Sequence, residues 1–69
     1  MSSLRLCENL TAIMKEQDIS ISALSDITGF SRSIISYWMH GKYIPGSYEL
    51  WKLSKALKVP MDDIYGEGN

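Results

Sequence analysis

The segment spanning residues 19–38 constrains the fold more than any other part of the chain, because a glycine separates two short helical patterns there. Ser20 is placed to cap a first helix. The inward positions of that helix share one helical face and are Ala23, Leu24 and Ile27. Gly29 follows where a helix commonly ends in left-handed backbone, which glycine adopts without a steric penalty. The pattern therefore predicts a short helix that ends in a tight turn.

A second short helix is predicted directly after this turn. Phe30 is large and apolar, so we expect it to tuck between the two helices. Ser31 is placed to cap the second helix. Ile35 and Trp38 are three residues apart and face inward. Ile34 lies at the boundary between the inward and the outward face of the helix. The outer and leading surface then carries Arg32, Ser33, Ser36 and Tyr37.

Such a helix is suited to contact with DNA. Hydrogen-bonding side chains at its start, with apolar residues behind them, allow a helix to enter the major groove. Its amino end adds free backbone N–H groups and a partial positive charge, which favour phosphate.

The remaining chain is expected to form the scaffold. A first helix is predicted from about Ser3 to Gln17, with an apolar stripe of Leu6, Leu10, Ile13 and Met14. Residues 40–46 are rich in turn formers, and Ser47 is placed to cap a fourth helix. The inward residues of that helix are Leu50, Leu53, Ala56 and Leu57. A last short helix is expected to end at Gly66, and residues 67–69 are expected to be disordered.

An ordered set of residues resembles the lambda-repressor and Cro type of helix-turn-helix domain, the XRE-like family. The set comprises Leu24, Gly29, Ser31-Arg32-Ser33, Ile35-Ser36, Trp38, Gly41-Lys42, Pro45, Leu50, Leu53, Ala56-Leu57, Val59 and Asp63-Ile64. The similarity runs from about Leu6 to Tyr65. It implies an all-α fold, a compact bundle of five short helices with the helix-turn-helix at about residues 20–40. It also implies binding of operator DNA, usually as a two-fold dimer on a palindromic site.

The resemblance and the chemistry of the side chains together predict the DNA contacts. The predicted base contacts are Arg32, Ser33, Ser36 and Tyr37, and arginine can bind guanine through two parallel hydrogen bonds. The predicted phosphate contacts are Ser20, Ser22, Ser31, His40, Lys42 and Tyr43, each of which can donate a hydrogen bond. For Ser31, capping is the main expected role. Tyr37 can stack on a sugar, touch a thymine methyl group or be an exposed aromatic without a partner.

Three residues depart from the family pattern. Ile21 stands where the family commonly has a glutamine that supports the backbone contact. It would expose an apolar side chain unless it packs against Tyr37 or Ile34. Met39 replaces a frequent acidic residue, which suggests that the following loop is held by packing rather than by a charge pair. Thr28 takes a position that is usually aliphatic, with Ile27 as the expected compensation.

The charge of the chain is slightly acidic, at −1, whereas a DNA-binding surface normally leaves a basic footprint. The charges are segregated, however. Between residues 29 and 58 the cations are Arg32, Lys42, Lys52, Lys55 and Lys58, against Glu49 alone. We expect Arg32 and Lys42 to meet DNA and the three later lysines to be ordinary solvated charges.

Other classes of protein fit the sequence poorly. A chain of 69 residues allows one domain with a small core, and it lacks a bilayer-spanning run or a secretory leader. The lone Cys7 and lone His40 predict no disulfide and no metal site. No cofactor, small-molecule ligand or enzymatic activity is expected. The expectation is a minimal cytoplasmic regulator of bacterial or phage origin, a repressor by default.

Two questions stay open at this stage. The domain can instead be a protein-interaction module, antitoxin-like or anti-repressor, with an apolar patch made of Ile21, Ile34, Tyr37, Met39 and Tyr43. The helices themselves must also form any homodimer, which can be weak or form only on DNA. The last helix is the candidate interface because it carries Met61, Ile64 and Tyr65; alternatively, these residues close the monomer core.

Overall fold

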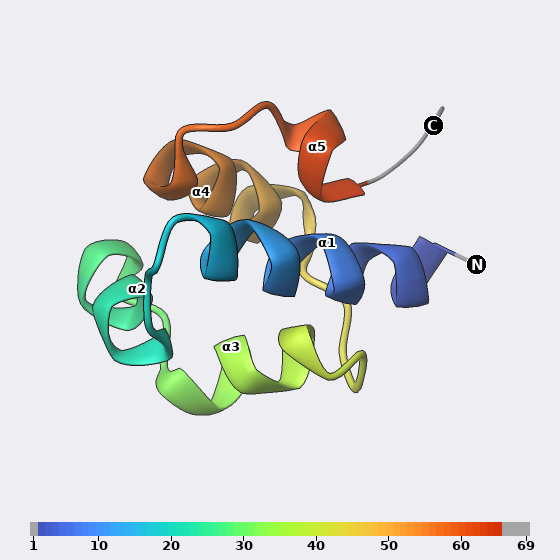
Figure 1. Ribbon diagram of the computed structural model, residues 1–69. Helices are drawn as coiled ribbons and strands as arrows, with labels where there is room; N and C mark the ends of the chain where they lie inside the picture. Colours follow the sequence, from blue (N-terminus) through green and yellow to red (C-terminus); the bar gives the residue numbers. More distant parts are fainter. Residues whose placement is uncertain (1, 66–69) are drawn as a thin grey trace.

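The computed structural model describes residues 2–65, which form five helices and no strand. These are α1 (Ser2–Glu16), α2 (Ile21–Thr28), α3 (Arg32–Met39), α4 (Ser47–Leu57) and α5 (Met61–Tyr65). Helix α1 runs through the middle, with α4 and α5 on one side of it, α3 on the other and α2 at its carboxyl end (Figure 1). The predicted all-α fold is confirmed. The expected end of the last helix at Gly66 and the expected disorder of residues 67–69 lie outside the described residues.

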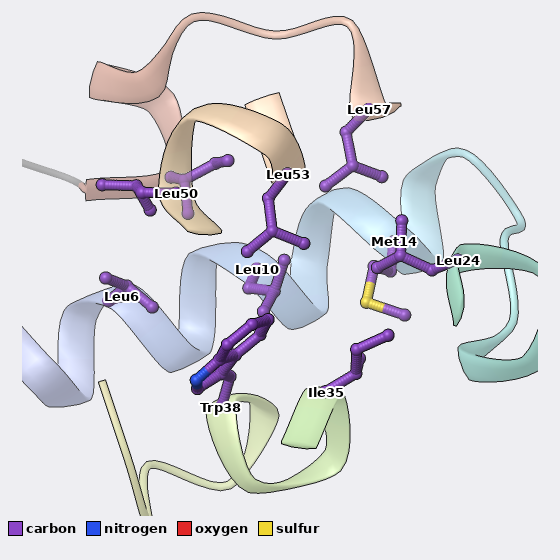
Figure 2. Packing of buried hydrophobic residues seen from close by; sticks show 10 residues of the cluster. Leu6, Leu10, Met14, Leu24, Ile35, Trp38, Leu50, Leu53 and Leu57 are labelled. Carbon is purple, nitrogen blue, oxygen red and sulfur yellow. The ribbon is translucent and has the colours of Figure 1, made fainter. Parts of the chain in front are cut away.

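The core forms where the inward faces of α1, α3 and α4 meet. Leu10, Trp38 and Leu53 point toward one another at its centre, and Met14, Leu24 and Ile35 extend it toward α2 (Figure 2). The buried apolar cluster comprises Leu6, Leu10, Met14, Leu24, Ile35, Trp38, Leu50, Leu53, Leu57 and Ile64. The predicted stripe of α1 is confirmed, with Ile13 at its partly buried margin.

Local hydrogen bonds fix the turn between α2 and α3. The Ser20 hydroxyl accepts a bond of 3.0 Å from the Ala23 N–H, so Ser20 caps α2 as predicted. Gly29 adopts left-handed backbone with φ of 83°, and its N–H donates to the Ser25 carbonyl at 2.8 Å. The Ser25 hydroxyl donates in turn to the Phe30 carbonyl at 2.6 Å. The chain therefore leaves α2 along a defined path.

The inward face of α2 differs from the prediction. Ile27 was expected to be buried and is 58% exposed, whereas Thr28 is 3% exposed. Leu24 and Thr28 are four residues apart and share the buried edge of the helix, which turns Ile27 toward solvent. Burial of the Thr28 hydroxyl is tolerated because it donates to the Leu24 carbonyl at 2.8 Å and accepts from the Phe30 N–H at 3.2 Å. Ile27 therefore does not compensate for Thr28.

The start of α4 also differs. Ser47 was expected to cap this helix, but it is the first helical residue, and Gly46 is the cap without a side-chain hydrogen bond. A Cβ atom added to Gly46 would lie 2.7 Å from a carboxylate oxygen of Glu49. The Glu49 side chain therefore folds back over the cap, where an acidic group is favoured by the helix dipole.

Helix α5 closes the monomer core. Ile64 is fully buried, and Met61 packs against the core cluster. The side-chain amide of Asn9 donates to the Ile64 carbonyl at 3.2 Å, which ties α5 to α1. Of the three residues proposed for a dimer interface, only Tyr65 is substantially exposed, at 42%. Burial of Ile64 and Met61 is what the monomer-core interpretation of this helix requires.

Two left-handed residues provide a test of this backbone. Changing Gly29 to alanine should lower the free energy of unfolding by about 1–2 kcal/mol, because alanine is strained at φ of 83° although nothing lies within 4 Å of its Cβ.

Lys58 is left-handed at the end of α4, with φ of 59°. Changing Lys58 to glycine should raise the free energy of unfolding by up to about 1 kcal/mol. Urea denaturation checks both changes, and an unaltered midpoint for Gly29→Ala would contradict the assignment.

Candidate DNA-binding surface

Helix α3 is held against the core by one face. Ile35 and Trp38 are buried, and Ile34 lies half-buried between the two environments, as predicted. Phe30 packs against Trp38 with their ring centroids 5.3 Å apart and their planes at 86°. This edge-to-face contact confirms that Phe30 tucks between the helices. The opposite face of α3 is thereby turned away from the core.

The outward face of α3 and the start of α2 together line one open depression of about 600 Å³. Its lining residues are Ser20, Ile21, Ser22, Arg32, Ser33, Ser36 and Tyr37. All four residues predicted to contact bases are in this set, together with two of those predicted to contact phosphate. The structure thus brings together residues from two separate helices. Their contact with DNA stays a prediction.

Both helices present their amino ends to this depression. The Ser31 hydroxyl accepts a bond of 3.1 Å from the Ile34 N–H, which confirms that Ser31 caps α3. The hydroxyl proton of Ser31 stays available as a donor. The first N–H groups of a helix lack partners within the helix, and the helix dipole adds positive charge there. This edge of the surface has the chemistry that phosphate requires.

The other predicted phosphate contacts lie at the carboxyl end of α3. His40 ends the helix, and its Nδ1 lies 2.8 Å from the Ser36 carbonyl oxygen. A carbonyl oxygen only accepts, so Nδ1 carries a proton in this bond. The remaining ring nitrogen, Nε2, can therefore donate to a phosphate only when the imidazole is protonated. The contact of His40 with phosphate stays a prediction.

Lys42 and Tyr43 adjoin Tyr37 from the loop after α3. The Lys42 N–H donates to the Tyr37 carbonyl at 2.9 Å, and the Lys42 ammonium lies 4.8 Å from the centre of the Tyr37 ring. The rings of Tyr37 and Tyr43 are 5.3 Å apart at 80°. The predicted phosphate contacts therefore fall into two groups, one at each end of α3.

The departures from the family pattern have structural explanations. Ile21 is half-buried, packs against the core and lines the depression beside Tyr37. Met39 also packs against the core, and the Thr11 hydroxyl lies 3.4 Å from the Met39 carbonyl oxygen. Packing and backbone hydrogen bonds therefore support the start of the loop, as expected from the replacement of an acidic residue.

Helix α4 carries an aromatic surface that was not predicted from the sequence. Tyr48 and Trp51 are exposed, with their ring centroids 6.1 Å apart. The Lys52 ammonium lies 5.6 Å from the centre of the Tyr48 ring, and the Lys55 ammonium lies 5.8 Å from that of Trp51. Two of the lysines expected to be simple solvated charges are thus placed over rings. The spacing of three and four residues along α4 was the signal for this arrangement.

Two other kinds of site are absent from residues 2–65. No group of three or more histidine, cysteine, aspartate or glutamate side chains in that range is placed to hold a metal ion. Among the helices there, none has both the length and the apolar composition needed to cross a bilayer.

The two serines at the start of α3 give a matched test. Ser31→Ala removes the bond to the Ile34 N–H and should lower the free energy of unfolding by about 1 kcal/mol. Ser33→Ala removes an exposed hydroxyl inside the first turn and should leave stability within about 0.5 kcal/mol of the parent. Chemical denaturation of the two variants measures the difference. Equal stabilities would show that the Ser31 bond does not hold α3.

The comparison with known families agrees with this geometry. A family model described as helix-turn-helix matches residues 10–64, which is most of the 69-residue chain. No curated protein and no solved structure gives a significant match. The matched range contains α2, the turn, α3 and α4, together with α1 from residue 10 onward and α5 up to residue 64. The chain therefore belongs to the helix-turn-helix family of Cro/CI type and is a DNA-binding regulator of this class.

Proposed function

We propose that the protein is a sequence-specific transcriptional repressor that reads a palindromic operator through the major groove with α3. The observation that carries this proposal is the single depression shared by α2 and α3. It combines an arginine and hydroxyl side chains, which can read base edges, with the amino ends of two helices, which can hold phosphate. Bound over a promoter, such a protein would exclude polymerase.

We propose that the protein binds the operator as a homodimer, and the size of the molecule supports this. The protein measures 30 Å along its longest axis and carries one outward-facing α3. The two half-sites of an operator lie about 34 Å apart on one face of the duplex. A single copy therefore reads one half-site, and a palindrome requires two. We propose that the dimer is weak in solution and is completed on DNA.

The acidic net charge does not oppose this role, because no acidic side chain is among the residues that line the depression. Arg32 lines the depression, and Lys42 adjoins Tyr37 beside it. The acidic residues Asp62 and Asp63 start α5, which lies across α1 from α3 (Figure 1). Screening limits the reach of such charges to about 8–10 Å at physiological salt.

The alternative role as a protein-interaction module has less support. Of the apolar patch expected for it, Ile21, Ile34 and Met39 pack against the core. Only Tyr37 and Tyr43 are exposed, at 38% and 52%. The aliphatic part of the patch is therefore half-buried against the core of the monomer.

Selection from a random duplex library tests the proposal directly. The purified protein is incubated with the library at about 50 and 150 mM salt, because phosphate contacts weaken steeply over this range. Enrichment of a palindrome with half-sites one helical turn apart is expected. If no sequence is enriched at either salt concentration, specific DNA recognition is excluded and the protein-interaction module becomes the better hypothesis.

Changing Arg32 to alanine should weaken binding to the selected operator by about 1–3 kcal/mol and relax the preference at one base position. Lys15→Ala is the matched control, because it removes an exposed cation from the last turn of α1. Titrations on the operator and on a scrambled duplex measure both effects. Equal losses on the two duplexes would limit Arg32 to phosphate contact.

Changing Lys42 to alanine should weaken binding to all sequences alike. It should also lower the slope of log binding constant against log salt concentration by roughly one unit, because one counterion fewer is released on binding. Measurements of the dissociation constant at several salt concentrations give this slope. A slope equal to that of the parent would remove Lys42 from the phosphate contacts.

A further inference from the structure

The orientation of Tyr37 depends on the loop that follows α3. We propose that Tyr43 is a positioning residue, whose ring holds Tyr37 in the orientation in which it meets DNA. The inference rests on the proposed function and assigns Tyr43 a role other than the phosphate contact predicted from sequence. In this role the aromatic ring of Tyr43 acts, and its hydroxyl group is dispensable.

The contacts of Tyr37 support this assignment. Its side chain leaves α3 on the exposed side and lacks the burial that fixes Ile35 and Trp38. Its ring meets the Tyr43 ring edge to face, with centroids 5.3 Å apart and planes at 80°. That separation and angle are within the preferred range for aromatic pairs. Tyr43 thus supplies a lateral support that the core does not provide.

The backbone places Tyr43 for this contact. The Lys42 N–H donates to the Tyr37 carbonyl at 2.9 Å, and the Gly41 N–H donates to the Trp38 carbonyl at 3.3 Å. Gly41 adopts a positive φ of 76°, which turns the chain back toward α3. Any movement of the loop therefore acts on Tyr37 through both the backbone and the ring.

Tyr43 rather than Lys42 provides the lasting support. The Lys42 ammonium lies 4.8 Å from the centre of the Tyr37 ring in the free protein. Its long, flexible side chain can leave the ring when a phosphate approaches. The Tyr43 ring has no charge to draw it away, so its contact persists in the complex. An ordered Tyr37 then loses less side-chain freedom on binding.

Two substitutions separate the ring of Tyr43 from its hydroxyl. Tyr43→Phe keeps the ring and should retain the operator preference of the parent. Tyr43→Leu removes the ring and should lower discrimination at the base pair next to Tyr37 by about 2–10-fold, with little change on scrambled duplex. Tyr48→Leu is the matched control, since Tyr48 is similarly exposed and packs on Trp51.

The combination with Tyr37 sharpens the test. If Tyr43 acts through Tyr37, Tyr43→Leu should have no further effect on discrimination in a Tyr37→Leu background. Melting temperatures of all variants confirm that the fold is retained, as expected for side chains this exposed. Proton chemical shifts of the Lys42 side chain give a second measurement without DNA. These protons lie over the Tyr37 ring, and their ring-current shift should shrink in Tyr43→Leu but persist in Tyr43→Phe.

The outcomes distinguish this inference from the proposed function. If the parent protein enriches no DNA sequence, the proposed function fails and the inference fails with it. If the parent selects an operator and Tyr43→Leu discriminates equally well, only the inference is overturned. If Tyr43→Phe loses as much affinity as Tyr43→Leu on every duplex, Tyr43 contacts phosphate through its hydroxyl and does not position Tyr37.

Discussion

The packing of Trp38 and Ile35 against α1 is the interaction on which the rest of this surface depends. Helix α3 has eight residues, which is too short for a stable isolated helix in water. Its shape and direction therefore come from the burial of these two side chains beside Leu10 and Met14 (Figure 2). Phe30 adds an aromatic contact from the turn. Without this packing, the outward side chains of α3 would no longer be held in fixed positions relative to one another.

Local hydrogen bonds define the turn before α3. Ser25 and Thr28 bind the backbone of Phe30 from two directions, and Gly29 closes α2. These bonds lie within six residues, so they form without help from distant parts of the chain. These bonds and the core contacts together define the angle between α2 and α3. The depression between the two helices is a product of that angle.

Features that depend on interactions between residues close in sequence were mostly predicted correctly. Caps at Ser20 and Ser31, the left-handed Gly29 and the stripe of α1 depend on spacing within a few residues, and all of them were predictable. Membership in the family was also evident from the ordered set of residues.

The errors arose where two neighbouring residues are similar candidates for one position. Ile27 and Thr28 are neighbours, and hydropathy alone favours the isoleucine for burial. The rotation of α2 against α4 and the internal bonds of the Thr28 hydroxyl reverse that choice. Ser47 is a better capping residue than Gly46, yet the carboxylate of Glu49 occupies the space beside the glycine. The shared depression was equally inaccessible to sequence analysis, because it depends on the relative placement of two helices.

The division of α3 into two faces has a consequence for how this surface can change over evolutionary time. Arg32 and Ser33 are exposed and take no part in the core, so substitutions there are compatible with the fold; under the proposed function they would change the preferred operator. Tyr37 is different, because its ring and carbonyl are tied to the loop at residues 42–43. A new residue at that position would have to coevolve with the loop. Substitutions in the first turn of α3 can thus occur independently, whereas substitutions in its last turn require matching changes in the loop that follows.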